Sequence, residues 1–454
     1  MPTSPSLLRQ WDNQYVWHPF APMQSYREEM PPIIERGEGF HLIDVHGNRY
    51  IDGFSSLWCN VHGHGVPDID EAIRQQLSLV SHSTLLGHGQ VRSIELAERL
   101  VKLAPPGLSK VFYSDSGSTA VEVALKIAFQ YHRQKPGGNN QRTLFVSIDQ
   151  AYHGDTVGSV SVGSIELFHH VYGPLLFRTL KVPSPVTYRL PAGHTPETYL
   201  EHCQAELSRV LDQHAEQIAA VVMEPLVQGA AGILVHPPGY LAEVRRQTRD
   251  RGILLIADEV AVGFGRTGTI FACEQEEVSP DLLCLGKGLS GGYLPLAATL
   301  ATEPIFDAFL GHPAEGKTFF HGHTFTGNAL ACAAALASLQ LFQRNHVLEN
   351  VNQVAKVLQQ ELAPLGELPI VGEVRSRGMM VGIELVADRQ TRRPFDPARR
   401  VGHAVTLKAR ERGLLIRPLG DVVVLMPAPA MPPDLVRDMV ALTRKSLEDW
   451  MRDS

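Results

Sequence analysis

The stretch "GILLIADEVAVGFGRTGTIFACEQEEVSPDLLCLGKGLSGG", residues 252–292, contains two short apolar runs that each end at charged side chains. The first run ends on Asp258 and Glu259, and the second is followed by Lys287. Short apolar runs of this kind are typical of strands buried in a parallel sheet. Lysine is rarely buried without a partner. The carboxylates therefore mark either an exposed strand end or the partner of a buried cation.

The same alternation of apolar runs and helical patterns continues on the N-terminal side of this stretch. Strands are predicted at 110–115, 143–149 and 218–225, and helices at 119–133 and 239–251. This order indicates an α/β domain with a mostly parallel sheet, which binds ligands beyond the carboxyl ends of its strands. The polar residues expected at that edge are Asp115, Tyr152, Glu224, Asp258 and Lys287.

The two ends of the chain have a different pattern. The C-terminal part alternates predicted strands at 378–386 and 422–428 with a closing amphipathic helix at 434–452, and short strand patterns occur before residue 60. We therefore expect a large central domain and a smaller α+β domain built from both chain ends. The expected boundaries are 1–65 and 341–454 for the small domain and 66–340 for the large one.

Composition excludes several classes of protein. The 454 residues are 44% hydrophobic and carry a net charge of −7, which argues against nucleic-acid or anionic-membrane partners and leaves small molecules. The five cysteines contain no C-x-x-C pair, as expected in a reducing compartment. The N-terminus lacks the pattern of a signal peptide, and the longest apolar stretch, 329–342, is too short to span a bilayer. We expect a cytoplasmic protein.

The segment "YSDSGSTAVE", residues 113–122, combines a strand end with a helix start. We expect the helix to begin near Thr119, with Thr119 and Glu122 as a capping box. The preceding Ser116, Gly117 and Ser118 would offer free backbone N–H groups, and a helix N-terminus of this kind attracts phosphate. The alternative is an ordinary capped helix.

Together these residues suit pyridoxal phosphate. That cofactor needs a lysine, a carboxylate for its pyridine nitrogen, a phosphate cup and a ring that stacks on its own. Lys287, Asp258, the segment 116–118 and Tyr152 supply all four. Burial would lower the pKa of the lysine and make it a useful nucleophile.

A competing motif surrounds the lysine. Gly288-x-Ser290-x-Gly292 matches the nucleophile elbow of serine hydrolases, which places its serine in a sharp turn between strand and helix. Ser290 instead lies four residues beyond the expected strand end, and Pro295 would disrupt a helix that starts at the elbow. The hydrolase interpretation is rejected.

Two other motifs are also weak. Gly263, Gly265 and Gly268 imitate a dinucleotide fingerprint, but no helix start follows them, so we expect them to bend the chain and leave Arg266 to an anion or a domain contact. Histidine pairs such as the one in "HGHTFTGN", residues 321–328, lack the carboxylate or cysteine that would complete a metal set. We predict no metal site.

The sequence resembles a known family. The stretch 252–292 is similar to the signature of the class III (ω-)aminotransferases, pyridoxal phosphate enzymes of fold type I. Further motifs resemble the 7,8-diaminopelargonic acid synthase subgroup, which aminates 8-amino-7-oxononanoate in biotin synthesis. These are "WHPFAPM", "SDSGSTAVEVALKIAFQYH", "AYHGDTVGSVSVG", "MEPLVQGAAGI" and "LLIRPLGDVVVLMP".

The resemblance implies cofactor roles. Lys287 would bind the cofactor covalently and move the proton, Asp258 would pair with the pyridine nitrogen, and Tyr152 would stack on the ring. Glu224 would belong to the hydrogen-bonding set near the ring. The phosphate would be held by Ser116, Gly117 and Ser118, together with Thr324 from the second subunit of a homodimer.

The resemblance also implies a substrate pocket. It would include Phe20, Trp58 and Gly322, with Arg417 holding the substrate carboxylate, as bidentate guanidinium groups do. Phe20 and His323 differ from the members that use S-adenosylmethionine and look more like those that use lysine, so either molecule could be the amino donor. The alternatives are a class III ω-aminotransferase for simple amines, β-alanine or ornithine-like substrates, and a catalytically silent pyridoxal-binding protein.

Overall fold

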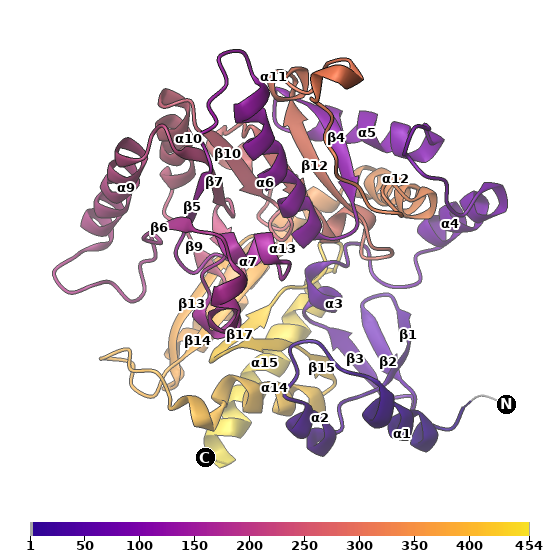
Figure 1. The fold of residues 1–454 in the computed structure, drawn as a ribbon. Helices are drawn as coiled ribbons and strands as arrows, with labels where there is room; N and C mark the ends of the chain where they lie inside the picture. The colour runs from indigo at the N-terminus through magenta and orange to yellow at the C-terminus, as the bar shows by residue number, and fades with distance from the viewer. Residues whose placement is uncertain (1–2, 454) are drawn as a thin grey trace.

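A seven-stranded sheet forms the centre of the computed structural model, which describes residues 3–453 (Figure 1). Neighbouring strands are parallel except for β12, which is antiparallel to both of its neighbours. The α/β class with a mostly parallel sheet is confirmed. In spatial order the strands are β4 (Leu108–Ser114), β12 (Ala297–Thr302), β11 (Leu282–Leu285), β10 (Leu254–Asp258), β7 (Ile218–Met223), β5 (Leu144–Ile148) and β6 (Thr179–Val182).

The strands of the opening stretch are buried on both faces. Along β10, Leu255 and Ala257 share one core with α5, α9, α10 and α12, whereas Leu254 and Ile256 share another with α6. This explains why the run is apolar at every position and does not alternate. The helices named here are α5 (Val91–Leu103), α6 (Gly117–Gln134), α9 (Pro196–Gln213), α10 (Tyr240–Asp250) and α12 (Ala329–Arg344).

The start of α6 differs from the prediction. The helix begins at Gly117, and its capping box pairs Ser116 with Thr119. Ser116 has extended backbone angles, φ −149° and ψ 163°, which turn its hydroxyl toward the Thr119 N–H. Glu122 is therefore free of capping, and its carboxylate accepts from the Gly158 N–H at 2.7 Å. The helix N-terminus therefore lies at Gly117, the glycine that is predicted to hold phosphate.

The N-terminal and C-terminal segments, indigo and yellow, both lie in the lower part of Figure 1. The short C-terminal strand β15 pairs in parallel with β3 of the N-terminal region, and a second sheet is entirely C-terminal. We propose the same domain boundaries, at residues 65 and 340. The first sheet has the order β1 (Ile34–Glu38), β2 (His41–Asp44), β3 (Arg49–Asp52) and β15 (Leu414–Leu415), and the second β13 (Val371–Arg377), β14 (Met380–Leu385), β17 (Val422–Leu425) and β16 (Arg417–Leu419).

Helices cover the second sheet and the chain termini. α13 and α15 pack on each other and share a core with β14 and β17. The remaining helices and strands are α1 (Pro5–Tyr15), α2 (Met23–Glu29), α3 (Ser55–Trp58), α4 (Pro67–Leu79), α7 (Val157–Val162), α8 (Glu166–His169), β8 (Val227–Gln228), β9 (Leu234–Val235), α11 (Glu303–Asp307), α13 (Val347–Leu362), α14 (Val401–Glu411) and α15 (Pro433–Asp453).

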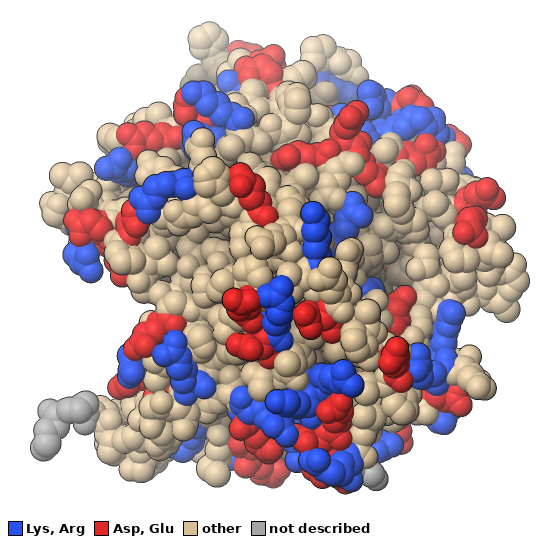
Figure 2. Space-filling view, turned by 180° about the vertical axis from the view of Figure 1, so that it is seen from behind, with Lys and Arg blue, Asp and Glu red and all other residues tan. Residues whose placement is uncertain are grey.

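The surface carries both signs of charge. Basic and acidic side chains are interspersed on the face shown in Figure 2. Among the helices within residues 3–453, none combines the length and the apolar character that crossing a bilayer requires. All five cysteines are free thiols.

Candidate active site

Four of the predicted residues follow four adjacent strands. Lys287, Asp258, Glu224 and Tyr152 lie at or just beyond the carboxyl ends of β11, β10, β7 and β5, which are neighbours in this order. In the β10–β11 register, Asp258 is opposite Cys284, which is three residues before Lys287. The sheet therefore brings the predicted lysine and carboxylates to one edge, as parallel strands do.

Lys287 has an unusual backbone and an unpaired amine. Its φ of 43° lies in the left-handed region, between two glycines that leave room for the turn. Its Nζ lies 4.9 Å from the centroid of the Trp58 ring and makes no hydrogen bond or ion pair to any residue of 3–453. Burial lowers the pKa of Lys287, and the negative charges of Asp258 and Glu224 oppose that shift. The amine is therefore buried, has no hydrogen-bond or ion-pair partner among the described residues, and has a lowered pKa.

Asp258 is held by a residue that the sequence analysis missed. The Nδ1 atom of His153 lies 2.7 Å from Asp258 Oδ2, and the Val260 N–H donates to Oδ1 at 3.1 Å. Both side chains are buried, and His153 Nε2 has no partner within the described chain. The available signal was position alone, because His153 directly follows Tyr152 in "AYHG".

Glu224 joins two loops, the one that contains Tyr152 and the one that contains Gly229. Its two oxygens accept from the Tyr152 N–H at 3.3 Å and from the Gly229 N–H at 2.8 Å. Burial raises the pKa of Glu224 to about 7, and the nearby Asp258 charge adds to the shift. Burial also raises the pKa of the Tyr152 phenol, which donates to Asp155 Oδ2 at 2.7 Å. Tyr152 is thus held at both its backbone and its hydroxyl.

The N-terminus of α6 forms a tight cradle beside the lysine. A Cβ on Gly117 would lie 2.4 Å from Val260 Cγ1, and the backbone of Gly117 packs against Gly286. The N–H groups of Gly117 and Ser118 donate to no residue of 3–453, as expected in the first turn of a helix. Free N–H groups at a bare helix start suit a phosphate group, so the residues present fit the cofactor predicted from the sequence.

The predicted carboxylate ligand is a guanidinium without a partner. Arg417 is half-buried on β16 and makes no hydrogen bond or ion pair with the described residues. Burial lowers its pKa, and the Tyr152 phenol acts in the opposite direction, so the two groups are near each other. Phe20 is 55% exposed and its ring contacts Phe168, which contacts Tyr152 in turn. Phe20 therefore lies at the outer end of this aromatic row.

The loop 320–328 is not part of the site within one chain. Gly322 and Thr324 are exposed, and the space around Gly322 is open. His323 does reach the same chain, where its Nδ1 lies 2.6 Å from Asp115 Oδ2. Asp115 directly precedes Ser116, so His323 lies beside the N-terminus of α6, and the next residue, Thr324, is exposed.

The remaining sequence motifs have structural roles. Arg266 is 2% exposed and donates to Ser55 Oγ and to the Asn60 and Pro427 carbonyl oxygens. It makes a domain contact, one of the two predicted alternatives. Ser290 Oγ donates to the Leu294 carbonyl, and Gly265 and Gly268 have positive φ, as expected of glycines that bend the chain.

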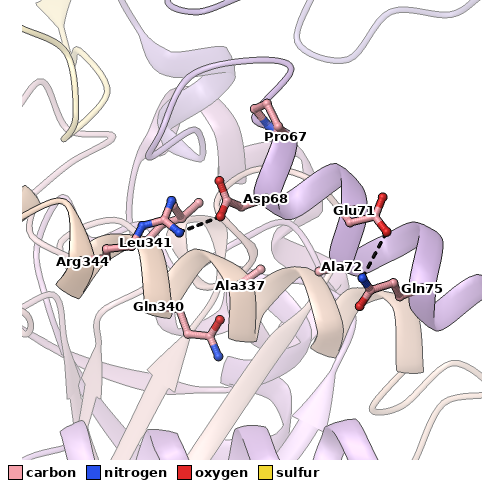
Figure 3. A pocket seen from close by; sticks show the side chains of 9 residues that line it. All are labelled: Pro67, Asp68, Glu71, Ala72, Gln75, Ala337, Gln340, Leu341 and Arg344. Carbon is pink, nitrogen blue, oxygen red and sulfur yellow. Dashed lines mark hydrogen bonds and ion pairs between the residues drawn. The ribbon is translucent and has the colours of Figure 1, made fainter.

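A surface groove elsewhere contains none of the predicted residues. It has a volume of about 490 Å³ and lies between α4 and α12, where the Arg344–Asp68 ion pair of 2.8 Å crosses it (Figure 3). Its position on the outside of the large domain separates it from the strand ends that carry Lys287 and Asp258.

Comparisons with known proteins agree with this geometry. A curated relative from Nitratidesulfovibrio vulgaris, the adenosylmethionine-8-amino-7-oxononanoate aminotransferase, is 60% identical over 92% of this chain and 78% of its own. The crystal structure of the enzyme of that name from Methanocaldococcus jannaschii matches with a TM-score of 0.93 and 45% identity, over 98% of this chain and 99% of that one.

A second solved structure and a family model give the same result. An amine transaminase from an uncultivated Pseudomonas species, in its PLP-bound form, matches with a TM-score of 0.91 and 36% identity, over 97% of this chain and 98% of that one. The family model for aminotransferase class III matches residues 23–443. The chain belongs to the class III aminotransferases.

Proposed function

We propose that the protein transfers an amino group to the 7-oxo group of 8-amino-7-oxononanoate and yields 7,8-diaminononanoate, a step of biotin synthesis. The curated relative that is 60% identical carries this acceptor in its name. The observation on this chain that supports the acceptor is the half-buried, unpartnered guanidinium of Arg417 near Tyr152. A chain with a free carboxylate, such as this acceptor, matches that charge.

Pyridoxal phosphate fits the residues at the strand ends. Its phosphate would be held by the N–H groups of Gly117 and Ser118 and by the hydroxyls of Ser116 and Ser118, and its ring would lie against Tyr152. When bound, the cofactor supplies an aldehyde that captures amines and a ring that withdraws electrons.

Two residues would handle the proton transfers. Lys287 Nζ, whose pKa is lowered by burial, would take a proton from the donor carbon and return one during the second half of the reaction. Asp258 would accept the N–H of a protonated pyridine. His153 and the Val260 N–H keep this carboxylate oriented, because each occupies a different oxygen.

The substrate pocket would exclude water through its apolar walls. Trp58 is buried and covers Lys287, and Arg417 would bind the acceptor carboxylate. Phe20 and Gly322 would complete the entrance. The donor is S-adenosylmethionine or lysine, and Phe20 and His323 are the positions that bear on this choice.

We also propose a homodimer that works in the cytoplasm. Leu86, Phe320 and Phe325 are 87%, 83% and 59% exposed. Phe320 and Phe325 lie in the same loop as Thr324, and the Phe325 ring contacts His82, four residues before Leu86. Exposed apolar patches of this kind mark protein interfaces. Thr324 would then reach the phosphate of the partner subunit.

The direct test is product identification. Holoenzyme is incubated with 8-amino-7-oxononanoate and either S-adenosylmethionine or lysine, and 7,8-diaminononanoate is measured by mass spectrometry. A parallel reaction offers pyruvate in place of this acceptor. We expect product with the oxononanoate and one of the donors. Exclusive use of pyruvate would overturn the proposed acceptor and favour the simple-amine alternative.

A further inference from the structure

The Tyr152 side chain is held at both ends, but these bonds restrict the plane of its ring only weakly. The Tyr152 N–H donates to Glu224 Oε1 at 3.3 Å, and the phenol donates to Asp155 Oδ2 at 2.7 Å. The first bond fixes the backbone and the second fixes the tip of the side chain, so the ring can still turn about the axis that ends at its hydroxyl. A ring that stacks on another needs a defined plane, because the attraction between aromatic rings depends on their relative orientation.

Two consecutive rings pack against Tyr152, one parallel to it and one edge-on. The His169 ring is parallel to the Tyr152 ring within 12°, with the ring centroids 6.2 Å apart. The Phe168 ring lies at 81° to the Tyr152 ring, with the centroids also 6.2 Å apart. His169 is 6% exposed and ends α8, whereas Phe168 is half-buried. The parallel, buried ring is therefore the contact that can set the plane of Tyr152.

The His169 ring is oriented by packing. Its Nδ1 and Nε2 atoms are both buried, and neither has a hydrogen-bond partner within residues 3–453. Burial lowers the pKa of His169, so the ring is uncharged at neutral pH. Among the described residues, the faces and edges of this ring thus make the contacts that hold it.

Gly163 provides the surface on which the His169 ring packs. A Cβ on Gly163 would lie 2.4 Å from His169 Cε1 and 2.9 Å from its Nδ1 atom. Gly163 has φ −77° and ψ 166°, which are angles open to any residue. The close approach of the ring, and not the backbone conformation, therefore requires glycine at this position.

The Gly163 segment is bonded to the sheet and to the loop that carries Tyr152. Lys181 Nζ, on β6, donates to the Gly163 carbonyl at 2.7 Å. The Ser164 N–H donates at 2.8 Å to the carbonyl of Ala151, which directly precedes Tyr152. The surface under the His169 ring is thus fixed relative to the tyrosine on which that ring stacks.

We infer that His169 is a positioning residue for the cofactor: its ring packs on Gly163 and on Tyr152, and so fixes the plane that Tyr152 presents to the pyridine ring. The inference rests on the proposed function, which places pyridoxal phosphate against Tyr152. It assigns a role to a histidine whose two nitrogens have no partner in the described chain, and it does not depend on which acceptor is used.

Equilibrium dialysis of the holoenzyme tests the inference. We expect His169→Ala to raise the dissociation constant of pyridoxal phosphate about tenfold and to weaken the circular dichroism of the visible cofactor band. His169→Phe keeps a flat ring without the nitrogens, and its dissociation constant should stay within about threefold of the wild type. A loss in His169→Phe as large as that in His169→Ala would show that the nitrogens act, and would overturn the inference.

A double-mutant cycle with Gly163 tests the packing directly. Alanine has no backbone cost at the angles of Gly163, but its Cβ would displace the His169 ring, so we expect Gly163→Ala to weaken cofactor binding as His169→Ala does. In a His169→Ala background the added methyl group has no ring to displace, and Gly163→Ala should have little further effect. Additive losses would overturn the inference.

A matched control separates positioning from stability. His132 is also a fully buried ring, and it lies in the last turn of α6, where its Nε2 atom is 2.8 Å from the Ala219 carbonyl oxygen. His132→Ala should lower the thermal midpoint at least as much as His169→Ala does, while leaving the dissociation constant of the cofactor unchanged. A similar rise in that constant with His132→Ala would show that general loosening is enough, and would contradict the inference.

A background without Tyr152 distinguishes this inference from the proposed function. We expect Tyr152→Ala alone to raise the dissociation constant of pyridoxal phosphate, and His169→Ala to add little in that background, because His169 acts through Tyr152. An unchanged constant in Tyr152→Ala would refute the proposed place of the cofactor. A raised constant in Tyr152→Ala, with an unchanged one in His169→Ala, would refute the positioning role alone.

Discussion

Arg417→Met is expected to impair the reaction and stabilise the protein at the same time. Arg417 is half-buried and has no hydrogen-bond or ion-pair partner among the described residues, so the free chain bears the cost of desolvating its charge. Methionine keeps much of the volume without the charge. Replacing buried charges by apolar side chains of similar size often stabilises a protein by about 1–4 kcal/mol. We expect a gain at the lower end of this range.

The loss of substrate binding should be larger than the gain in stability. A hydrogen bond to a charged group contributes about 1.5–3 kcal/mol, and a guanidinium can make two with one carboxylate. A loss of about 3 kcal/mol raises the KM for 8-amino-7-oxononanoate on the order of a hundredfold. Steady-state kinetics measures the change in KM, and differential scanning calorimetry of the holoenzyme measures the midpoint of thermal unfolding.

Arg375 is the matched control on the same sheet. Its guanidinium is paired with Glu373 at 2.9 Å and with Glu384 at 2.8 Å. Arg375→Met leaves Glu373 without this partner and Glu384 paired with Arg189 alone, and should destabilise the protein by about 3 kcal/mol. If Arg417→Met lowered the midpoint as Arg375→Met does, or left the KM unchanged, Arg417 would not be an unpaired charge reserved for a carboxylate.

Three other predictions concern the pKa of Glu224, the orientation of the Asp258 carboxylate and the proposed homodimer. Burial raises the pKa of Glu224 from 4.5 to about 7. The stability that Glu224 contributes is therefore complete below pH 4.5 and falls by about 3 kcal/mol as the pH rises to 7. Urea unfolding at pH 5 and pH 7 should show a loss of stability in the wild type that is absent in Glu224→Gln, and equal losses in the two proteins would contradict this prediction. His153→Phe removes the 2.7 Å partner of Asp258 and should lower kcat about tenfold with little change in KM, whereas an unchanged kcat would exclude the positioning role. Mixing the inactive Lys287→Ala variant with the impaired Thr324→Ala variant should restore activity. If Thr324 acts across the interface, a mixed dimer has one site with both residues intact. No gain in activity over the separate variants would show that Thr324 acts within its own subunit.

The strand ends could be predicted because their sequence pattern is local. The runs before Asp258 and Lys287 are apolar at every position, and β10 and β11 are buried on both faces. The antiparallel strand β12 was not predicted, since "LAATLAT" follows β11 without a helix between them. The start of α6 was misplaced because Ser116 and Thr119 are equally good caps, and only the extended backbone of Ser116 decides between them.

The residues that support the site could not be predicted, because their partners are distant in sequence. His153 meets Asp258 across 105 positions, and Arg266 meets Ser55 across 211. The positive φ values of residues 55–58 have no sequence signal either, since "SSLW" contains neither glycine nor asparagine. Sequence therefore identified the residues expected at the reaction centre, while the contacts that orient them depend on the tertiary fold.

The central claim is that Lys287 is the residue that carries the cofactor. Holoenzyme is reduced with sodium borohydride, which makes the bond between a lysine and an aldehyde cofactor permanent, and the modified peptide is mapped by mass spectrometry. We expect the cofactor mass on the peptide that contains Lys287, and neither this modification nor visible cofactor absorbance in Lys287→Ala. Cofactor attached to a different lysine, or a Lys287→Ala variant that still turns over, would contradict the claim.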